Sequence, residues 1–126
     1  LLLYLHGGTS TGNDNEKQME EPGVDSISNY LKTRKVNACM LVPQCPARQS
    51  WTGPAGYVLK SLIDEYVNQG IVDAGRIYVF GGSMGGTGTW SMLATYPDLF
   101  AAAMPVAGNP EKAGEYSSST PLLTVM

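Results

Sequence analysis

Residues 81–85, with the sequence Gly-Gly-Ser-Met-Gly, constrain the fold of this chain more than any other stretch. They follow the apolar run 77–80, which is typical of a buried strand, and precede residues 84–95, whose pattern predicts a helix. A serine flanked by glycines at such a junction predicts a sharp turn that strains the serine backbone and exposes its hydroxyl. Larger neighbours would collide with the strand and the helix. We therefore expect Ser83 to be a nucleophile rather than an idle serine in a glycine-rich turn.

A second glycine motif, Leu-His-Gly-Gly at residues 5–8, follows a short apolar run at the start of the chain. Glycine allows the backbone to approach a substrate closely, and main-chain N–H groups stabilise a developing oxyanion. The position of the motif favours the N–H group of Gly8 for this role, with Thr9 as the second choice. Met84 directly follows the serine and would supply the other N–H group. The catalytic set predicted from these motifs is Ser83, Met84 and Gly8.

His6 is the only histidine in the sequence, which makes it a tempting general base. Its place in the Leu-His-Gly-Gly motif favours another role, in which the ring braces the glycine loop through hydrogen bonds. Cysteine and histidine residues show no metal-ligand spacing, so we expect neither a metal nor another cofactor.

Composition narrows the remaining possibilities. The length of 126 residues predicts one domain, residues 1–126. A net charge of −3 without a basic stripe indicates no nucleic-acid binding, and no apolar run is long enough to span a membrane. Cys39 and Cys45 are six residues apart, which is about 20 Å in an extended chain and too far for a disulfide, so we expect two free thiols.

Strands and helices alternate along the chain. The predicted strands are residues 1–6, 36–43, 77–80, 101–107 and 122–126. Helices are predicted at 84–95 and at 58–68. The apolar positions of the second are Val58, Leu59, Leu62, Ile63, Tyr66 and Val67. A further short helix is predicted after Asp25, which would be its N-cap. This order predicts an α/β fold with a mainly parallel sheet and helices on both faces. Because the chain opens inside one predicted strand and closes on another, we expect a domain truncated at both ends.

Several motifs together resemble those of bacterial α/β-hydrolases. They are Leu-His-Gly-Gly at 5–8, Val-Pro-Gln-Cys-Pro at 42–46, Trp51, Val-Asp-Ala-Gly-Arg-Ile-Tyr-Val at 72–79, Gly-Gly-Ser-Met-Gly-Gly at 81–86 and Tyr-Pro-Asp-Leu-Phe-Ala-Ala at 96–102. The group they resemble is the esterase group often labelled "predicted peptidase", related to feruloyl esterases and polyhydroxybutyrate depolymerases. The resemblance implies a three-layer α/β-hydrolase fold and ester cleavage through an acyl-enzyme on Ser83. It also implies a small-molecule or carbohydrate-linked ester as substrate. Many relatives are exported, so the resemblance favours a periplasmic or extracellular protein without fixing the compartment.

In the hydrolase order the triad acid follows the second strand after the nucleophile strand, and the histidine comes later. Residues 122–126 are that strand, so the triad Asp and His are expected beyond Met126. A serine peptidase or an acyltransferase would use the same machinery. For the isolated chain, a catalytically silent fragment or binding module is a further alternative, and exposed sheet edges predict self-association.

Two candidate substrate-binding residues, Gln44 and Trp51, lie in the loop after the second predicted strand. This loop is at the edge of the sheet where hydrolase clefts open. The sequence leaves two roles open for Trp51, which either lines an acyl or aromatic pocket or covers the end of the sheet.

Overall fold

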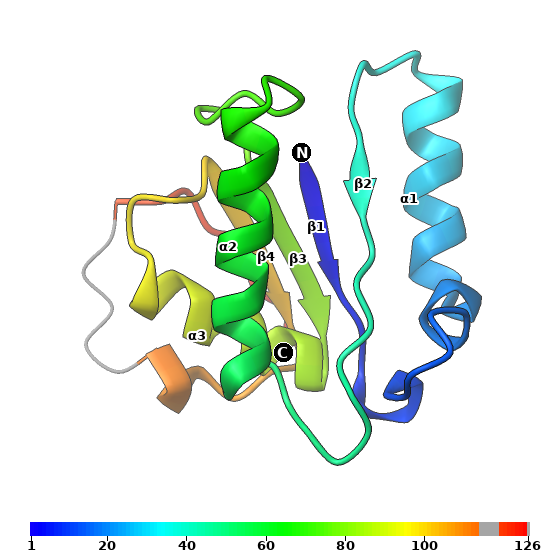
Figure 1. Ribbon diagram of the computed structural model, residues 1–126, viewed down its shortest axis with the longest axis vertical. Helices are drawn as coiled ribbons and strands as arrows, with labels where there is room; N and C mark the ends of the chain where they lie inside the picture. Colours follow the sequence, from blue (N-terminus) through cyan, green and yellow to red (C-terminus); the bar gives the residue numbers. More distant parts are fainter. Residues whose placement is uncertain (114–118, 126) are drawn as a thin grey trace.

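The computed structural model describes residues 1–113 and 119–125 (Figure 1). Its sheet has the strand order β2-β1-β3-β4, and every pair of neighbours is parallel. The strands are β1 (Leu2–Leu5), β2 (Met40–Leu41), β3 (Tyr78–Gly82) and β4 (Ala102–Val106). The helices are α1 (Pro22–Thr33), α2 (Pro54–Asn68) and α3 (Met84–Thr95), with 3-10 turns η1 (Gly8–Ser10), η2 (Lys17–Glu20) and η3 (Pro110–Ala113). This arrangement confirms the predicted α/β architecture with a parallel sheet.

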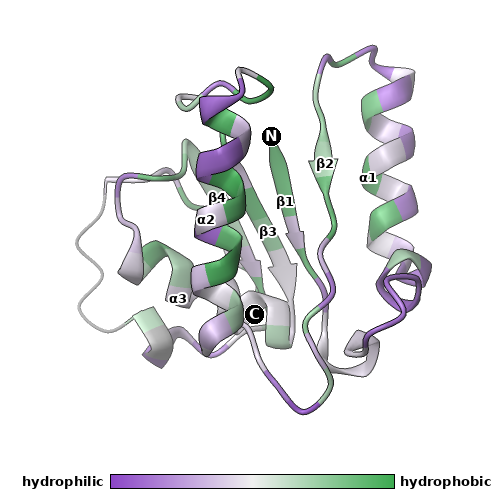
Figure 2. Ribbon diagram, viewed as in Figure 1, coloured by the Kyte–Doolittle hydropathy of each residue, from purple (hydrophilic) through white to green (hydrophobic). Residues whose placement is uncertain are grey.

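The hydrophobic core lies between the sheet and the helices α2 and α3. Its most deeply buried members are Leu3, Leu5, Ile63, Ile77, Val79 and Leu93. Because side chains alternate along a strand, Leu3 and Leu5 point to the same face of β1. Figure 1 shows α2 crossing in front of the sheet, and Figure 2 shows that the strands beneath it are mostly hydrophobic.

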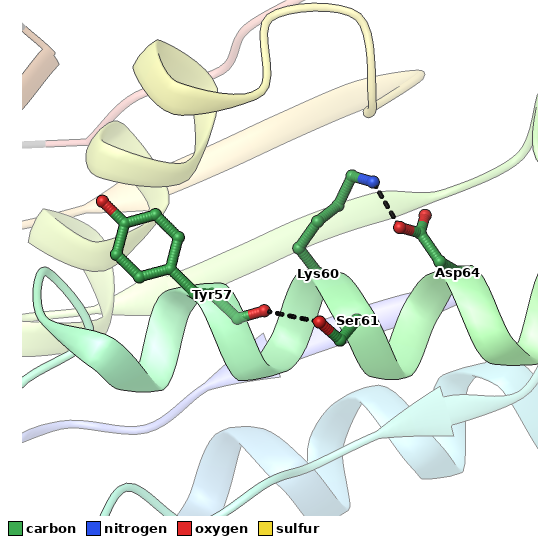
Figure 3. A network of polar contacts seen from close by, with 4 residues as sticks. All are labelled: Tyr57, Lys60, Ser61 and Asp64. Carbon is green, nitrogen blue, oxygen red and sulfur yellow. Dashed lines mark hydrogen bonds and ion pairs between the residues drawn. The ribbon is translucent and has the colours of Figure 1, made fainter.

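Helix α2 is amphipathic, as predicted, but its buried stripe is narrower than expected. Leu59 and Ile63 are buried, whereas Val58 is 64% exposed. A step of one residue rotates about 100° around a helix, which carries Val58 away from the sheet. The exposed face has an ion pair of 2.6 Å between Lys60 and Asp64 (Figure 3). The hydroxyl of Ser61 donates to the carbonyl of Tyr57 on the same helix.

Helix α1 begins earlier than predicted. Its N-cap is Glu21 and its first residue is Pro22, so Asp25 lies within the first turn instead of capping it. Proline suits this position because its fixed φ is already helical and the first N–H groups of a helix have no internal partner.

The second strand is much shorter than the predicted 36–43. The backbone before it is used locally, because the N–H of Val36 donates to Leu31 and Lys35 adopts a positive φ of 52°. Pairing with β1 begins only at Cys39, whose carbonyl accepts from the N–H of Leu2.

Residues 122–125 lie parallel to β4, but only as two isolated bridges, Ala103 with Leu122 and Val106 with Val125. The backbone N–H groups of Ala103 and Ala107 donate to this segment. Pro105, midway between them, has no N–H group to donate, which interrupts the ladder. The predicted last strand is therefore present beside β4 in a broken form, and its final residue, Met126, lies outside the described residues.

The face of the sheet away from α2 and α3 carries an open apolar groove of about 560 Å³. Its lining includes Leu2, Tyr30, Tyr78, Phe80, Met104 and Leu123. Among the residues that the structure describes, α1 borders this groove on one side and the segment 121–123 on the other.

Candidate active site

Ser83 occupies the turn between β3 and α3 in a conformation that few residues other than glycine adopt. Its backbone angles are φ 56° and ψ −117°, and its side chain is exposed. The turn is fixed on both sides, because the N–H of Ser83 donates to Val106 and its carbonyl accepts from Thr87. A strained residue that is held this firmly at an exposed turn is typical of a functional site.

The glycines around Ser83 allow the tight packing that produces this turn. A Cβ atom on Gly81 would collide with the backbone of Gly85, and one on Gly85 would collide with the carbonyl of Leu5. A Cβ atom on Gly86 would likewise collide with the carbonyl of Val106 at the end of β4. The small residues predicted for this motif are therefore required because α3 begins in direct contact with the ends of β1 and β4.

The predicted oxyanion loop lies against the turn at Ser83. A Cβ atom on Gly7 would be 3.9 Å from the Ser83 Cβ, and one on Gly8 would be 4.0 Å from the sulfur of Met84. Gly8 begins η1 and Met84 begins α3, so their N–H groups have no partner within their own helices. The structure thus brings Ser83, Met84 and Gly8 together from elements far apart in the sequence.

His6 is fully buried and both of its ring nitrogens are used. Nε2 accepts a hydrogen bond of 2.8 Å from the N–H of Cys45, which assigns the proton to Nδ1. Nδ1 lies 2.7 Å from the carbonyl of Gly7 and donates to it. The ring therefore joins the Gly7 loop to the Cys45 loop, which is the bracing role expected from the sequence, and neither nitrogen is free to deprotonate Ser83.

Trp51 is buried, with 2% of its surface exposed. Its indole N–H donates to the carbonyl of His6, and its ring meets the His6 ring edge-on at 4.9 Å. On its other side the indole fills the space that a side chain on Gly88 would need. This packing favours the second of its two predicted roles, covering the end of the sheet.

Gln44 lies next to the oxyanion loop, half-buried, and its amide holds residues 10–15. Its side-chain nitrogen donates to Ser10 and to Asp14, and its oxygen accepts from the N–H of Asn15. Hydrogen bonds from the backbone of Glu16 and Lys17, followed by the one from Gln44, lower the pKa of Asp14. All three contacts are within the protein, so Gln44 supports the loop that follows Gly8.

Glu21 contacts the predicted oxyanion loop, a role that the sequence motifs did not indicate. Its carboxylate accepts hydrogen bonds from the backbone of Gly7 and from the hydroxyls of Ser10 and Tyr4. A glutamate in a polar stretch carries no local signal of such a role, because its partners are between 11 and 17 residues away.

Cys39 and Cys45 are free thiols, as predicted, and burial raises the pKa of the Cys45 thiol. Within residues 1–113 and 119–125, no cluster of three or more His, Cys, Asp or Glu side chains is arranged to hold a metal ion. No helix in the described part of the chain is long and apolar enough to cross a membrane.

Known proteins share both the sequence and the fold of this chain. The pattern of the Prolyl oligopeptidase family matches residues 59–124. Poly(3-hydroxyalkanoate) depolymerase C of Paucimonas lemoignei is 41% identical over 68 residues, which are 54% of this chain and 16% of that protein. Acetylxylan esterase A of Emericella nidulans is 46% identical over 52 residues, which are 41% of this chain and 17% of that protein.

A thermostable esterase of known crystal structure superimposes with a TM-score of 0.75 and 27% identity. The superposition covers 98% of this chain and 36% of the esterase, so the chain spans only part of the length of its relatives. The family pattern covers more than half of the chain and the fold agrees with it. The chain therefore belongs to the prolyl oligopeptidase family, within the α/β-hydrolase enzymes.

Proposed function

We propose that this chain carries the nucleophile and the oxyanion hole of a serine carboxylic-ester hydrolase. The observation that supports this most is the strained, exposed Ser83 at the start of α3, with the Gly7 and Gly8 loop packed against it. A small-molecule or carbohydrate-linked ester is the proposed substrate, because the matched relatives include a polyester depolymerase and an acetylxylan esterase.

In the proposed reaction, the Ser83 hydroxyl attacks the ester carbonyl carbon while a histidine accepts its proton. The N–H groups of Met84 and Gly8 donate hydrogen bonds to the resulting oxyanion. The tetrahedral intermediate collapses to an acyl-enzyme, and the alcohol leaves with the proton from the histidine. Water, deprotonated by the same histidine, then attacks the acyl-enzyme and releases the acid and the free serine.

The proposal places the histidine and its carboxylate partner beyond Met126. His6 is the only histidine of the sequence and both of its nitrogens are engaged. Substrate contacts by Gln44 and Trp51 were predicted and remain proposals. For the buried Trp51, the packing favours the alternative role of covering the end of the sheet.

Labelling with a fluorophosphonate probe, followed by mass spectrometry, tests this function. We expect Ser83 to be labelled in a natural chain that continues past Met126, and not in its Ser83→Ala variant. The isolated 126 residues should react far more slowly, because removal of triad members leaves only about 10³–10⁴-fold catalysis over water. Equally fast labelling of the short chain would make His6 the base and contradict the assignment. Absence of labelling in both would instead favour a binding module.

A peptidase is the second candidate, because the family pattern is that of prolyl oligopeptidases. An ester and an amide with the same acyl group separate the two functions. Esters react faster than amides even at a serine peptidase, so the amide decides. We expect the ester to be hydrolysed and the amide to remain uncleaved, and measurable turnover of the amide would favour the peptidase.

A further inference from the structure

The Glu21 side chain turns away from its own helix and toward the oxyanion loop. Glu21 is the N-cap of α1, yet its carboxylate makes no capping hydrogen bond. One carboxylate oxygen accepts from the Tyr4 hydroxyl at 3.1 Å. The other accepts from the Gly7 N–H at 3.0 Å and from the Ser10 hydroxyl at 2.6 Å. One side chain therefore holds the end of β1, the glycine loop and η1 together.

These contacts fix the peptide group that carries the proposed oxyanion donor. Glu21 holds the N–H of Gly7, while the Gly7 carbonyl accepts from His6 and from the N–H of Ser10. A trans peptide is planar, so the direction of the Gly7 carbonyl also sets the opposite direction of the Gly8 N–H. With both sides of Gly7 held, the Gly8 N–H has one orientation available.

The Glu21 carboxylate and the turn at Ser83 both lie close to Gly7. A Cβ atom on Gly7 would lie 3.9 Å from the Glu21 carboxylate and 3.9 Å from the Ser83 Cβ. A negative charge this near an oxyanion disfavours it unless hydrogen bonds absorb the charge. Three donors surround the carboxylate, which suits it to hold the loop without acting on the substrate.

We propose that Glu21 is a positioning residue for the oxyanion hole, which it acts on through Gly7 and Ser10. This inference rests on the function proposed above. It assigns to Glu21 no contact with substrate and no proton transfer. Its effect should appear in the rate of the chemical step, because misplacing a catalytic group by about 1 Å costs on the order of 10²-fold in rate.

Two substitutions in the full-length protein separate geometry from charge. Glu21→Ala removes all three hydrogen bonds, so we expect kcat to fall by about 10–100-fold while KM changes by less than about threefold. Glu21→Gln keeps an amide oxygen for Gly7 and Ser10, and its NH₂ group can donate to the Tyr4 oxygen. We expect it to retain kcat within about threefold of the unaltered protein. Glu20→Ala, an exposed neighbour with the same charge change, is the matched control.

Steady-state kinetics on a small ester and hydrogen exchange of residues 5–13 are the two measurements. In Glu21→Ala, exchange of the Gly7 amide, which loses its acceptor, should accelerate while that of α3 stays unchanged. A Glu21→Ala variant as fast as Glu20→Ala would overturn the proposal. Equal losses in Glu21→Gln and Glu21→Ala would also overturn it, since charge would then matter rather than position. If the unaltered protein neither hydrolyses esters nor reacts with the probe, the proposed function fails. The hydrogen-exchange measurement then tests by itself whether Glu21 holds the Gly7 loop. Unchanged exchange of the Gly7 amide in Glu21→Ala would show that it does not.

Discussion

At the scale of single residues, Ser83 shows how a site keeps a conformation that is locally unfavourable. The positive φ of 56° is held by backbone hydrogen bonds at both ends of the turn and by the close packing of Gly81 and Gly85. A non-glycine residue in such a region costs on the order of 1–3 kcal/mol.

Ser83→Gly should relieve this strain. Because glycine also gains entropy in the unfolded chain, we expect a net increase in unfolding free energy of only about 1 kcal/mol. Ser83→Ala keeps the strain and should leave stability nearly unchanged, while both variants lose reaction with a fluorophosphonate. Urea unfolding of the three proteins measures the difference. A Ser83→Gly variant less stable than Ser83→Ala would mean that the turn stores no strain.

Tyr4 gives the folded chain a dependence on alkaline pH. Burial, the charge of Glu21 and the hydrogen bond to it raise the pKa of Tyr4 from 10.0 to about 12. Because the folded value lies above the unfolded value, the stability gained from the neutral phenol is fully present below about pH 10 and is lost as the pH rises toward about 12.

Tyr4→Phe removes this dependence. We expect its unfolding free energy to fall less steeply than that of the unaltered protein between about pH 10 and about pH 12. Tyr78→Phe, at an exposed tyrosine of β3, is the control and should keep the original slope. Chemical unfolding at several pH values measures the slopes, and identical slopes for all three proteins would contradict the assignment to Tyr4.

At the scale of elements, the junction of β3 and α3 positions Ser83, the proposed nucleophile. Gly85, in the first turn of α3, lies so close to the end of β1 that no side chain fits between them. Gly82, three residues earlier, faces open space. The two glycines of this motif therefore differ: the close approach of the backbone requires a glycine at position 85, whereas a side chain at position 82 would meet no neighbouring atom.

Gly85→Ala should destabilise the fold by about 1–3 kcal/mol or more, because the added methyl group meets backbone rather than a movable side chain. Gly82→Ala meets nothing within 4 Å and should be neutral or slightly stabilising, since alanine loses less entropy on folding. Denaturant midpoints measure both changes. Equal losses in the two variants would show that the close approach of Gly85 does not matter.

At the scale of the whole molecule, the two faces of the sheet differ. Helices α2 and α3 cover one face, while the other carries the apolar groove between α1 and residues 121–123. Tyr30 and Leu123 beside this groove are 59% and 62% exposed. Large exposed apolar surfaces of this kind promote association.

The isolated chain should therefore self-associate, and Leu123→Glu should shift it toward monomer because the charge lies beside the groove. Val58→Glu is the matched control, since Val58 is 64% exposed on α2, away from the groove. Sedimentation velocity at several concentrations measures both variants. A chain that stays monomeric with a sharp, concentration-independent unfolding transition would contradict the expectation.

The sequence by itself determined the features that depend on a few neighbouring residues. The order of strands and helices and the turn at Ser83 follow from hydrophobic periodicity and from glycine at positions where only glycine fits. Element ends were less predictable. Hydrogen bonding of Val36 to Leu31 shortened β2, and Pro105 interrupted the pairing of residues 122–125 with β4.

Only the tertiary structure decided what the individual side chains of the site do. His6 accepts a hydrogen bond from the backbone N–H of Cys45, which is 39 residues away in the sequence. The indole of Trp51 donates to the carbonyl of His6, which is 45 residues away. The carboxylate of Glu21 meets its three partners only in the folded chain, because they lie 11 to 17 residues away in the sequence. Local patterns act through backbone geometry over a few residues, whereas these roles depend on which loops the sheet brings together, and no pattern of neighbouring residues encodes that.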